Sequence, residues 1–331
     1  MIHILLCPHV LSFGGAQSSL HHWARHLDPS RFKISVLAMA AGGFSEKYEA
    51  TYPTLYDEPG YPNIGRFISE LKPDILHAAP GGGTDLAYIT RAAGLTTVTQ
   101  TVMCPRKAGN VKDVAASVVL SKFVLSLQAP GADNIVQIDA PFDTSDYDVK
   151  YGRAHFGLPE NKILIGSLGN ARKENSHFLK IARHYNNPDV HFAIKSNQKY
   201  KYLLGRSRIT SIERELSEDE KLSFINCFDI FLYPTSNEAY GVVFLEAMSQ
   251  KVPIVTYDDS ANPETVGAGG VMTPLNDIDK MTGALDSLVK DKEARARIGQ
   301  SGYDLFVKRN DPKKIAKQYE AFFEGANKRQ R

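Results

Sequence analysis

Short β-branched runs alternate with segments of helical apolar spacing along the first half of the chain. The runs predict strands at Ile2–Cys7, Lys33–Met39, Asp74–His77, Thr96–Thr101 and Ala115–Leu120. Between them, apolar residues recur every three to four positions and predict helices at Ser18–Leu27, Ile64–Leu71 and Asp85–Ala93. Strands that alternate with helices are typical of a parallel sheet with helices on both faces.

The same alternation restarts after a stretch with little periodicity, Asp139–Leu158, which we expect to be a linker. Strand patterns follow at Lys162–Leu168, Val190–Lys195, Asp229–Tyr233 and Pro253–Thr256, and helix patterns at Asn175–Tyr185, Glu218–Asn226 and Val242–Ser249. After Asp277 the spacing is helical in three segments, Lys280–Val289, Glu293–Leu305 and Pro312–Phe323.

These patterns predict an α/β fold of two doubly wound, Rossmann-like domains that face each other across a cleft. We expect the first domain at residues 1–150 and the second at 151–310. Residues 311–331 are expected to form a C-terminal helix and basic tail that packs back on the first domain.

The composition narrows the class of protein. The 331 residues and 43% apolar content suit two globular domains rather than a disordered chain. The three cysteines are odd in number and form no Cys-x-x-Cys pair, which argues against a disulfide framework or a metal knuckle. Residues 1–150 carry 12 Lys and Arg against 14 Asp and Glu, and the rest carry 27 against 23. Neither half therefore has the basic face of a nucleic-acid-binding protein, although the second could hold a small anion.

The expected compartment is the cytoplasm. The N-terminal run MIHILLCPHVLSF lacks the basic region and the apolar length of a signal peptide. The apolar stretch Val114–Leu127 is interrupted by Lys122 and is too short to span a membrane. The basic tail, Asn327–Arg331, leaves open a weak contact with anionic lipid at the inner membrane face.

Two glycine-containing turns follow expected strands. At Gly14 and Gly15 the backbone can approach a ligand closely, and the helix that follows offers free N–H groups to an anion. The turn is not the Gly-x-Gly-x-x-Gly of dinucleotide sites, and a simple tight loop is the alternative. The second turn, which begins at Gly166, ends in Arg172 and Lys173, which are either a diphosphate clamp or ordinary surface charges.

The strongest candidate is the segment from Tyr233 to Met248, where an expected strand ends and a helix follows. A helix that begins near Gly241 leaves Glu238 just before its N-terminus. The unpaired amides there would face an anion, and they belong to Ala239, Tyr240, Gly241 and Val242. Glu246 lies inside the apolar run of this helix, a poor place for a carboxylate without a function. The pair indicates a ligand with a central phosphate and hydroxyls on both sides, unless Glu238 is a helix cap and Glu246 a surface charge.

This segment resembles a known family. Glu238 and Glu246 match the Glu-x7-Glu motif of retaining glycosyltransferases of the GT-B fold, the glycosyl transferases group 1 or family 4-like enzymes. The flanking matches are Pro234-Thr235-Ser236, Glu246-Ala247-Met248 and Val252-Pro253-Ile254-Val255. In the first half, Gly14-Gly15-Ala16 is similar to the family's Gly-Gly loop, and Lys72-Pro73-Asp74-Ile75-Leu76-His77 to its Pro-Asp-hydrophobic-His strand.

The resemblance implies a role for each matched residue. Glu238 would be the catalytic-site contact to the donor sugar, Glu246 would bind the nucleotide ribose, and Lys173 with Arg172 would bind the diphosphate. The backbone from Ala239 to Val242, with Gly15, would hold sugar and phosphate. The acceptor would lie near Gly14, His77, Thr101 and the loop Met103–Lys107. The resemblance implies no metal and no cofactor besides the nucleotide diphosphate sugar, which is the donor substrate.

Three positions depart from the family's pattern. Ser167 stands where the family has an arginine, and Thr101 stands where it often has a histidine near the reacting carbon. Ala140-Pro141 replaces the Asn-Gly turn that is common before the linker.

Other candidates for chemistry are weaker. Asp146-x-Asp148 and Asp277-x-Asp279 match a metal-binding motif, but helix caps or solvated charges are expected at both. His21, His22 and His26 share an expected helix without a convergent carboxylate, so metal binding is not expected.

The sequence therefore predicts a retaining enzyme that transfers a hexose-type sugar from a nucleotide diphosphate sugar to a glycan, lipid-linked or small-molecule acceptor. Two alternatives remain open. One is a nucleotide-sugar 2-epimerase. The other is a non-catalytic nucleotide-sugar-binding protein of the same fold, which the residues at Ser167 and Thr101 motivate.

Overall fold

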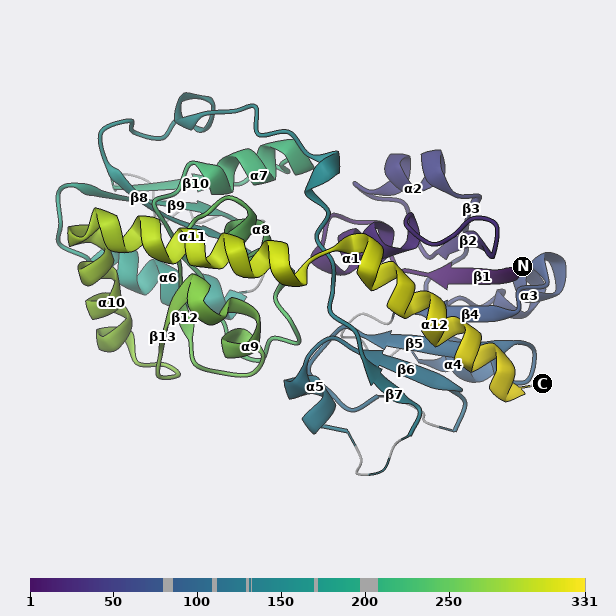
Figure 1. Cartoon of the computed structure of the whole chain (residues 1–331). Coiled ribbons are helices and arrows are strands. Elements are labelled where there is room, and N and C mark those ends of the chain that lie inside the picture. Colours follow the sequence, from purple (N-terminus) through teal and green to yellow (C-terminus); the bar gives the residue numbers. More distant parts are fainter. Residues whose placement is uncertain are drawn as a thin grey trace. The chain divides into compact units, whose positions relative to one another are not determined.

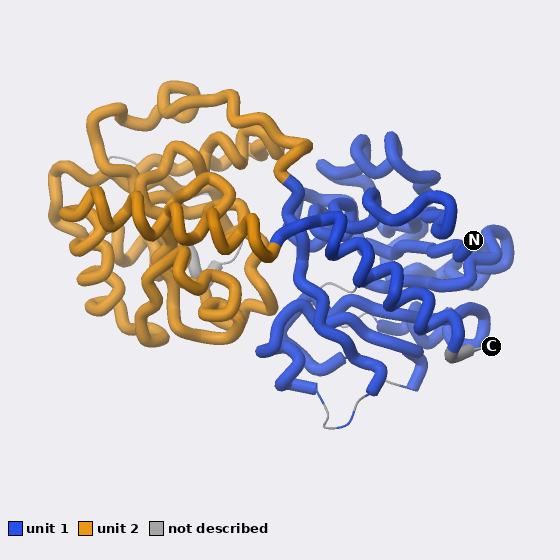
Figure 2. The backbone as a smooth tube through the Cα atoms, viewed as in Figure 1, with its two compact units in different colours: residues 1–143, 310–331 blue, residues 144–309 orange. Residues whose placement is uncertain are grey.

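The chain forms two compact units, each with its own parallel sheet (Figures 1 and 2). The computed structural model describes residues 1–79, 86–108, 112–128, 131, 133–169, 172–196 and 208–330, with the backbone alone at 172–175, 329 and 330. Unit 1 comprises Met1–Asp143 and Asn310–Arg331, and unit 2 comprises Thr144–Arg309. The chain leaves unit 1 after Asp143, inside the segment expected to be a linker, and its last helix belongs to unit 1.

Unit 1 contains a parallel sheet with the strand order β3-β2-β1-β4-β5-β6-β7. The strands are β1 (Ile2–Cys7), β2 (Phe32–Ala38), β3 (Thr54–Tyr56), β4 (Ile75–Ala78), β5 (Thr97–Val102), β6 (Ala116–Val119) and β7 (Ile135–Gln137). The helices are α1 (Gly15–Ala24), α2 (Ser45–Thr51), α3 (Ile64–Leu71), α4 (Ala87–Ala92), α5 (Lys122–Ser126) and α12 (Pro312–Gln330).

Unit 2 contains a second parallel sheet with the order β10-β9-β8-β11-β12-β13. Its strands are β8 (Ile163–Leu168), β9 (Val190–Lys195), β10 (Ile209–Ile212), β11 (Ile230–Leu232), β12 (Ile254–Tyr257) and β13 (Gly270–Thr273). Its helices are α6 (Arg172–His184), α7 (Glu218–Asn226), α8 (Val242–Ser249), α9 (Asn262–Val266), α10 (Ile278–Lys290) and α11 (Lys292–Arg309). The expected α/β class with two doubly wound sheets is confirmed.

Alternation along the strands of unit 2 creates one apolar face. Ile165, Phe192 and Leu232 point to the same side of the sheet and pack against Phe178 of α6 and Leu285 of α10, all of them buried. Successive side chains of a strand point to opposite faces, so the intervening residues face α7 and α8.

The core of unit 1 is closed by α12, whose apolar residues repeat at helical spacing. Tyr319 stacks on Trp23 with ring centroids 4.1 Å apart, and Phe323 packs beside it. His77 of β4 lies beneath this layer with no exposed surface, its Nδ1 2.9 Å from Thr99 Oγ1 and its Nε2 2.9 Å from Thr101 Oγ1. Burial lowers the pKa of His77 to about 3, so the ring is neutral in the folded chain.

None of the described helices combines the length and the apolar character that crossing a membrane requires.

We expect the stability of unit 1 to fall as the pH drops from 6.5 to 4.5. The pKa of His77 is lowered in the folded state, so below pH 6.5 the unfolded chain takes up a proton that the folded chain does not. Each such histidine should cost up to about 1.4 kcal/mol of unfolding free energy per pH unit. His77→Gln removes this term, and its unfolding free energy should fall less steeply than that of the unmodified chain. Urea unfolding, followed by the fluorescence of the single tryptophan, Trp23, gives the unfolding free energy of both proteins at each pH. Equal slopes of this free energy against pH would contradict a neutral His77 in the folded chain.

Candidate functional site

The candidate site lies at the carboxyl edge of the sheet in unit 2. The strand order reverses between β8 and β11, so the connections after these neighbouring strands leave in opposite directions. Such a reversal opens a crevice at the carboxyl ends of the strands, where α/β proteins bind ligands. One connection runs from Leu168 into α6, and the other runs from Leu232 through residues 233–241 into α8 (Figure 1).

Glycines let the two connections approach each other. A Cβ on Gly169, after β8, would lie 2.7 Å from the ring of Tyr233, which follows β11. Gly241, the residue before α8, has φ of +81°, and a Cβ there would lie 2.5 Å from the ring of Phe244. Glycine alone adopts this left-handed backbone readily. The turn into α8 therefore requires glycine for both its conformation and its packing.

Side chains of α9 hold the loop 233–241 in place through hydrogen bonds. Asn262 is fully buried, and its Nδ2 donates to the carbonyl oxygens of Thr235 at 3.0 Å and Tyr257 at 3.1 Å. Thr265 Oγ1 donates to the carbonyl oxygen of Tyr240 at 2.6 Å. Because these bonds come from a helix packed under the loop, the loop has one defined shape.

This shape positions the half-buried Glu238. Its backbone N–H donates to Ser260 Oγ at 2.9 Å, and its Oε1 accepts a hydrogen bond from Thr235 Oγ1 at 3.0 Å. Glu238 is not the cap of α8, because that position belongs to Gly241, which provides no side-chain hydrogen bond. The alternative for Glu238, that it is the helix cap of α8, is therefore wrong.

The N-terminus of α8 provides hydrogen-bond donors. The amides of Val242 and Val243 have no acceptor in the part of the chain that the structure describes. The first amides of a helix carry partial positive charge and bind anions. Of the other residues expected here, Ala239 and Tyr240 are buried in the loop that leads to the helix.

Glu246 lies one and a half turns into α8 with only 3% of its side chain exposed. Lys221 Nζ of α7 lies 2.9 Å from its Oε1, and no partner of Oε2 is found among the described residues. Burial raises the pKa of this carboxyl, and the charge of Lys221 acts in the opposite direction. An acceptor oxygen that no protein group satisfies is available to a hydrogen-bond donor of a ligand or of water.

The two expected diphosphate residues, Arg172 and Lys173, form the first turn of α6, directly after the connection from β8. Their side chains lie outside the described part of the chain. Ser167, where the family has arginine, is buried in β8, in register with Ile194.

The expected residues of unit 1 lie in two different settings. Gly14 and Gly15 are partly exposed at the start of α1. His77 and Thr101, in contrast, lie 2.9 Å apart in the core and expose no surface. The interpretation of an acceptor side on unit 1 therefore depends on Gly14, Gly15 and the loop Met103–Lys107, whose residues are partly exposed.

The weaker candidates have structural settings of their own. Asp277 caps α10, because its side chain accepts a hydrogen bond from the Lys280 N–H at 2.9 Å, as the cap interpretation predicted. The expectation that no carboxylate converges on His21, His22 and His26 is wrong, since Asp143 Oδ2 lies 2.7 Å from His26 Nε2, just beyond the end of α1. Among the described residues, no group of three or more His, Cys, Asp or Glu side chains could hold a metal ion.

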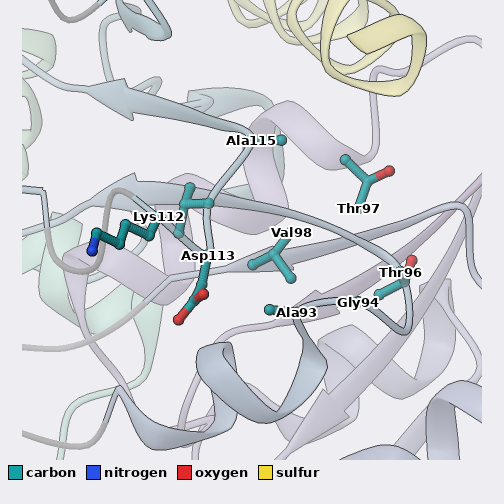
Figure 3. A pocket seen from close by; sticks show the side chains of 9 residues that line it. Ala93, Gly94, Thr96, Thr97, Val98, Lys112, Asp113 and Ala115 are labelled. Carbon is teal, nitrogen blue, oxygen red and sulfur yellow. The ribbon is translucent and has the colours of Figure 1, made fainter. Parts of the chain in front are cut away.

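Two cavities of the described chain lie at the opposite, amino edges of the sheets. One, of about 300 Å³, is lined by residues at the starts of β5 and β6, among them Thr97 and Ala115 (Figure 3). The other, of about 570 Å³, is lined by residues around the starts of β8 and β9, among them Lys162 and Val190. Neither includes Glu238 or Glu246.

Sequence reasoning missed Lys221 and Asn262. The spacing Glu218-x-x-Lys221 on an expected helix places both charges on one face, and this pattern could have pointed to a partner for Glu246. Asn262 had no such pattern, because its contacts are to backbone carbonyls that only the folded loop brings near it.

Comparison with known proteins identifies the domain that contains this site. Residues 152–305 match the family described as "Glycosyl transferases group 1". The chain carries a glycosyl transferases group 1 domain. This domain occupies nearly all of unit 2 and includes both glutamates of the motif, so the resemblance stated from the sequence is confirmed.

Relatives and solved structures cover different shares of the chain. The O-antigen biosynthesis glycosyltransferase WclY of Escherichia coli is 27% identical over 177 residues, which are 51% of this chain and 48% of WclY. The match thus spans about half the length of that relative. The structure of Anabaena Alr3699/HepE in complex with UDP-glucose has a TM-score of 0.79 at 16% identity, over 98% of this chain and 100% of that one. The structure described as a putative UDP-N-acetylglucosamine 2-epimerase from Listeria monocytogenes has a TM-score of 0.69 at 14% identity. The match covers 97% of this chain and 95% of that one. These two likenesses concern the fold alone, and the fold is GT-B.

We expect Gly241→Ala to destabilise the group 1 domain by roughly 1–3 kcal/mol, because alanine is strained at positive φ and its Cβ would meet Phe244. Gly283→Ala is the matched control. Gly283 lies on the exposed side of α10 with open space around it, and alanine there should stabilise the domain by about 0.5–1 kcal/mol. Thermal unfolding measures the change in stability of each variant relative to the unmodified chain. A Gly241→Ala protein as stable as the control would contradict the role given to this turn.

Proposed function

We propose that this chain is a retaining glycosyltransferase that moves a hexose-type sugar from a nucleotide diphosphate sugar to an acceptor in glycan or glycolipid synthesis. The observation that carries the proposal is the pairing of unpartnered helix amides with a buried carboxylate on α8. The amides of Val242 and Val243 suit a phosphate, and Glu246 Oε2 suits a hydroxyl one turn further along. A nucleoside diphosphate presents both groups a few ångströms apart.

In this proposal each matched residue has one task. The diphosphate would lie against the start of α8, with Arg172 and Lys173 supplying positive charge to the leaving phosphate. Glu246 would accept hydrogen bonds from the ribose. Glu238, held by Thr235 and Ser260, would orient the donor sugar. Helix amides and cations can stabilise this leaving group, so the proposal includes no metal.

The comparisons support the donor more than the acceptor. HepE was solved with UDP-glucose, and WclY is named for O-antigen synthesis. Both fit a donor site on unit 2 and an acceptor that is a growing glycan or its lipid carrier. The base and the sugar of the donor are left open in this proposal, and so is contact with a membrane surface.

Glu246→Gln should weaken binding of UDP or GDP roughly tenfold to a hundredfold, because a hydrogen bond to a charged group contributes about 1.5–3 kcal/mol. Glu293→Gln, at an exposed position on α11 of the same unit, is the control and should bind as the unmodified chain does. Isothermal titration calorimetry measures the affinities. Equal affinity of the Glu246→Gln and control proteins would contradict the role of Glu246.

The reaction itself is tested with nucleotide sugars followed by proton NMR. A transferase converts the donor when a suitable acceptor is added, and the anomeric coupling of the product should match that of the donor. Inversion at C2 of the sugar without any acceptor would identify a 2-epimerase instead. Binding without conversion across a wide acceptor panel would indicate a non-catalytic binding protein.

A further inference from the structure

Three charged side chains form a buried cluster between α7 and α8. Lys221 lies between two carboxylates, with its Nζ 2.9 Å from Glu246 Oε1 and 3.1 Å from Glu218 Oε2. The side chains of Lys221, Glu218 and Glu246 are only 14%, 11% and 3% exposed. Glu218 and Lys221 come from the first turn of α7, whose start is fixed by a capping box between Ser217 and Glu220.

The stability of the fold alone does not explain such a cluster. Removing charges from water costs several kcal/mol for each ion, and apolar residues of similar volume often stabilise a protein more than a buried ion pair does. The cluster also holds two carboxylates for one lysine, and therefore a net charge of −1. This arrangement places a cation against a buried carboxylate at the edge of the candidate site.

The two carboxylate oxygens of Glu246 have different surroundings. Oε1 is occupied by Lys221, and Oε2 has no partner in the described part of the chain. Without Lys221 the carboxyl would have lost its cation and would still face Glu218, and both changes favour the protonated form. A protonated carboxyl can accept fewer hydrogen bonds from a ligand hydroxyl.

We propose that Lys221 is a positioning residue for the donor: it fixes Glu246 through Oε1 and keeps it ionised, so that Oε2 accepts from a hydroxyl of the nucleotide. This role rests on the function proposed above for Glu246. Lys221 itself is assigned no contact with the reacting atoms.

The groups that face the cluster define the controls. From α7 they are Lys221 and Glu218, and from the segment that precedes β8 it is Tyr147, whose buried side chain acts electrostatically on Lys221. Of these, Glu218 acts against Lys221, because its charge raises the pKa of Glu246. Glu218→Gln and Lys221→Met are therefore expected to shift the ionisation of Glu246 in opposite directions.

The first experiment measures the affinity for UDP and GDP between pH 5.5 and 8.5. The informative quantity is the ratio of the variant's dissociation constant to that of the unmodified chain at each pH, which cancels the titration of the ligand. For Lys221→Met this ratio should be about tenfold or more at pH 6 and should decrease toward pH 8.5, as Glu246 becomes ionised. Lys221→Arg keeps the cation, and its ratio should not depend on pH.

A second pair of proteins separates positioning from a merely structural role. In a background of Glu246→Gln nothing titrates at this position, so adding Lys221→Met should give a ratio independent of pH. Should Lys221→Met not fold, Glu218→Gln carries the test, and the loss of affinity on acidification should move to lower pH than in the unmodified chain.

Each outcome decides one question. A ratio for Lys221→Met that is the same at every pH, or an unmoved acid midpoint in Glu218→Gln, overturns the role of Lys221 and leaves the proposed function intact. An unmodified chain that binds none of UDP, GDP, ADP and dTDP overturns the proposed function itself.

Discussion

A wholly parallel sheet places the carboxyl ends of all its strands at one edge, and the site of this protein depends on that constraint. In unit 2 the order reverses between β8 and β11, so two connections leave the same edge side by side. Gly169 and Tyr233 bring these connections into contact, and Gly241 turns the second one into α8. The N-terminus of α8 lies at this edge because the helix follows the carboxyl end of β11 through a short loop.

The candidate site combines two kinds of polar group. The amides at the start of α8 present partial positive charge, while Glu238 and Glu246 present carboxylates before and after them. The cap position of α8 belongs to Gly241, and Asn262 holds the loop that carries Glu238. Lys221 balances only part of the buried charge. In the proposed function, a molecule with anionic and hydroxyl groups would satisfy both kinds at once.

The sequence predicted the parts of the fold that apolar periodicity determines. β1, α3, β9, α7 and α8 have the expected bounds, because the apolar residues that define each pattern are buried in the core. The outer strands β3, β7, β10 and β13 were missed, since they are short and only partly buried, and α5 and α9 were missed because five residues are too few to show a period. Within the site, the glutamate pair could be predicted from its spacing. Lys221 and Asn262 could not, because their partners lie on other elements.

The same limit applies to His77. Its place in a motif suggested a ligand contact, whereas packing under Trp23 and Tyr319 keeps it neutral and fully buried. A sequence match assigns a residue to a position in a strand, but exposure depends on what covers that strand. Here the covering helix, α12, lies more than 200 residues away along the chain.

The most direct test of the central claim is an amide NMR titration of the chain labelled with ¹⁵N-valine. On addition of UDP or GDP, Val242 and Val243 should show the largest shift changes, because their N–H groups would bind the phosphate. Val190, at the amino edge of the same sheet, should stay unchanged. Shift changes at Val190 with none at Val242 and Val243 would contradict the claim that the carboxyl edge of unit 2 is the nucleotide site.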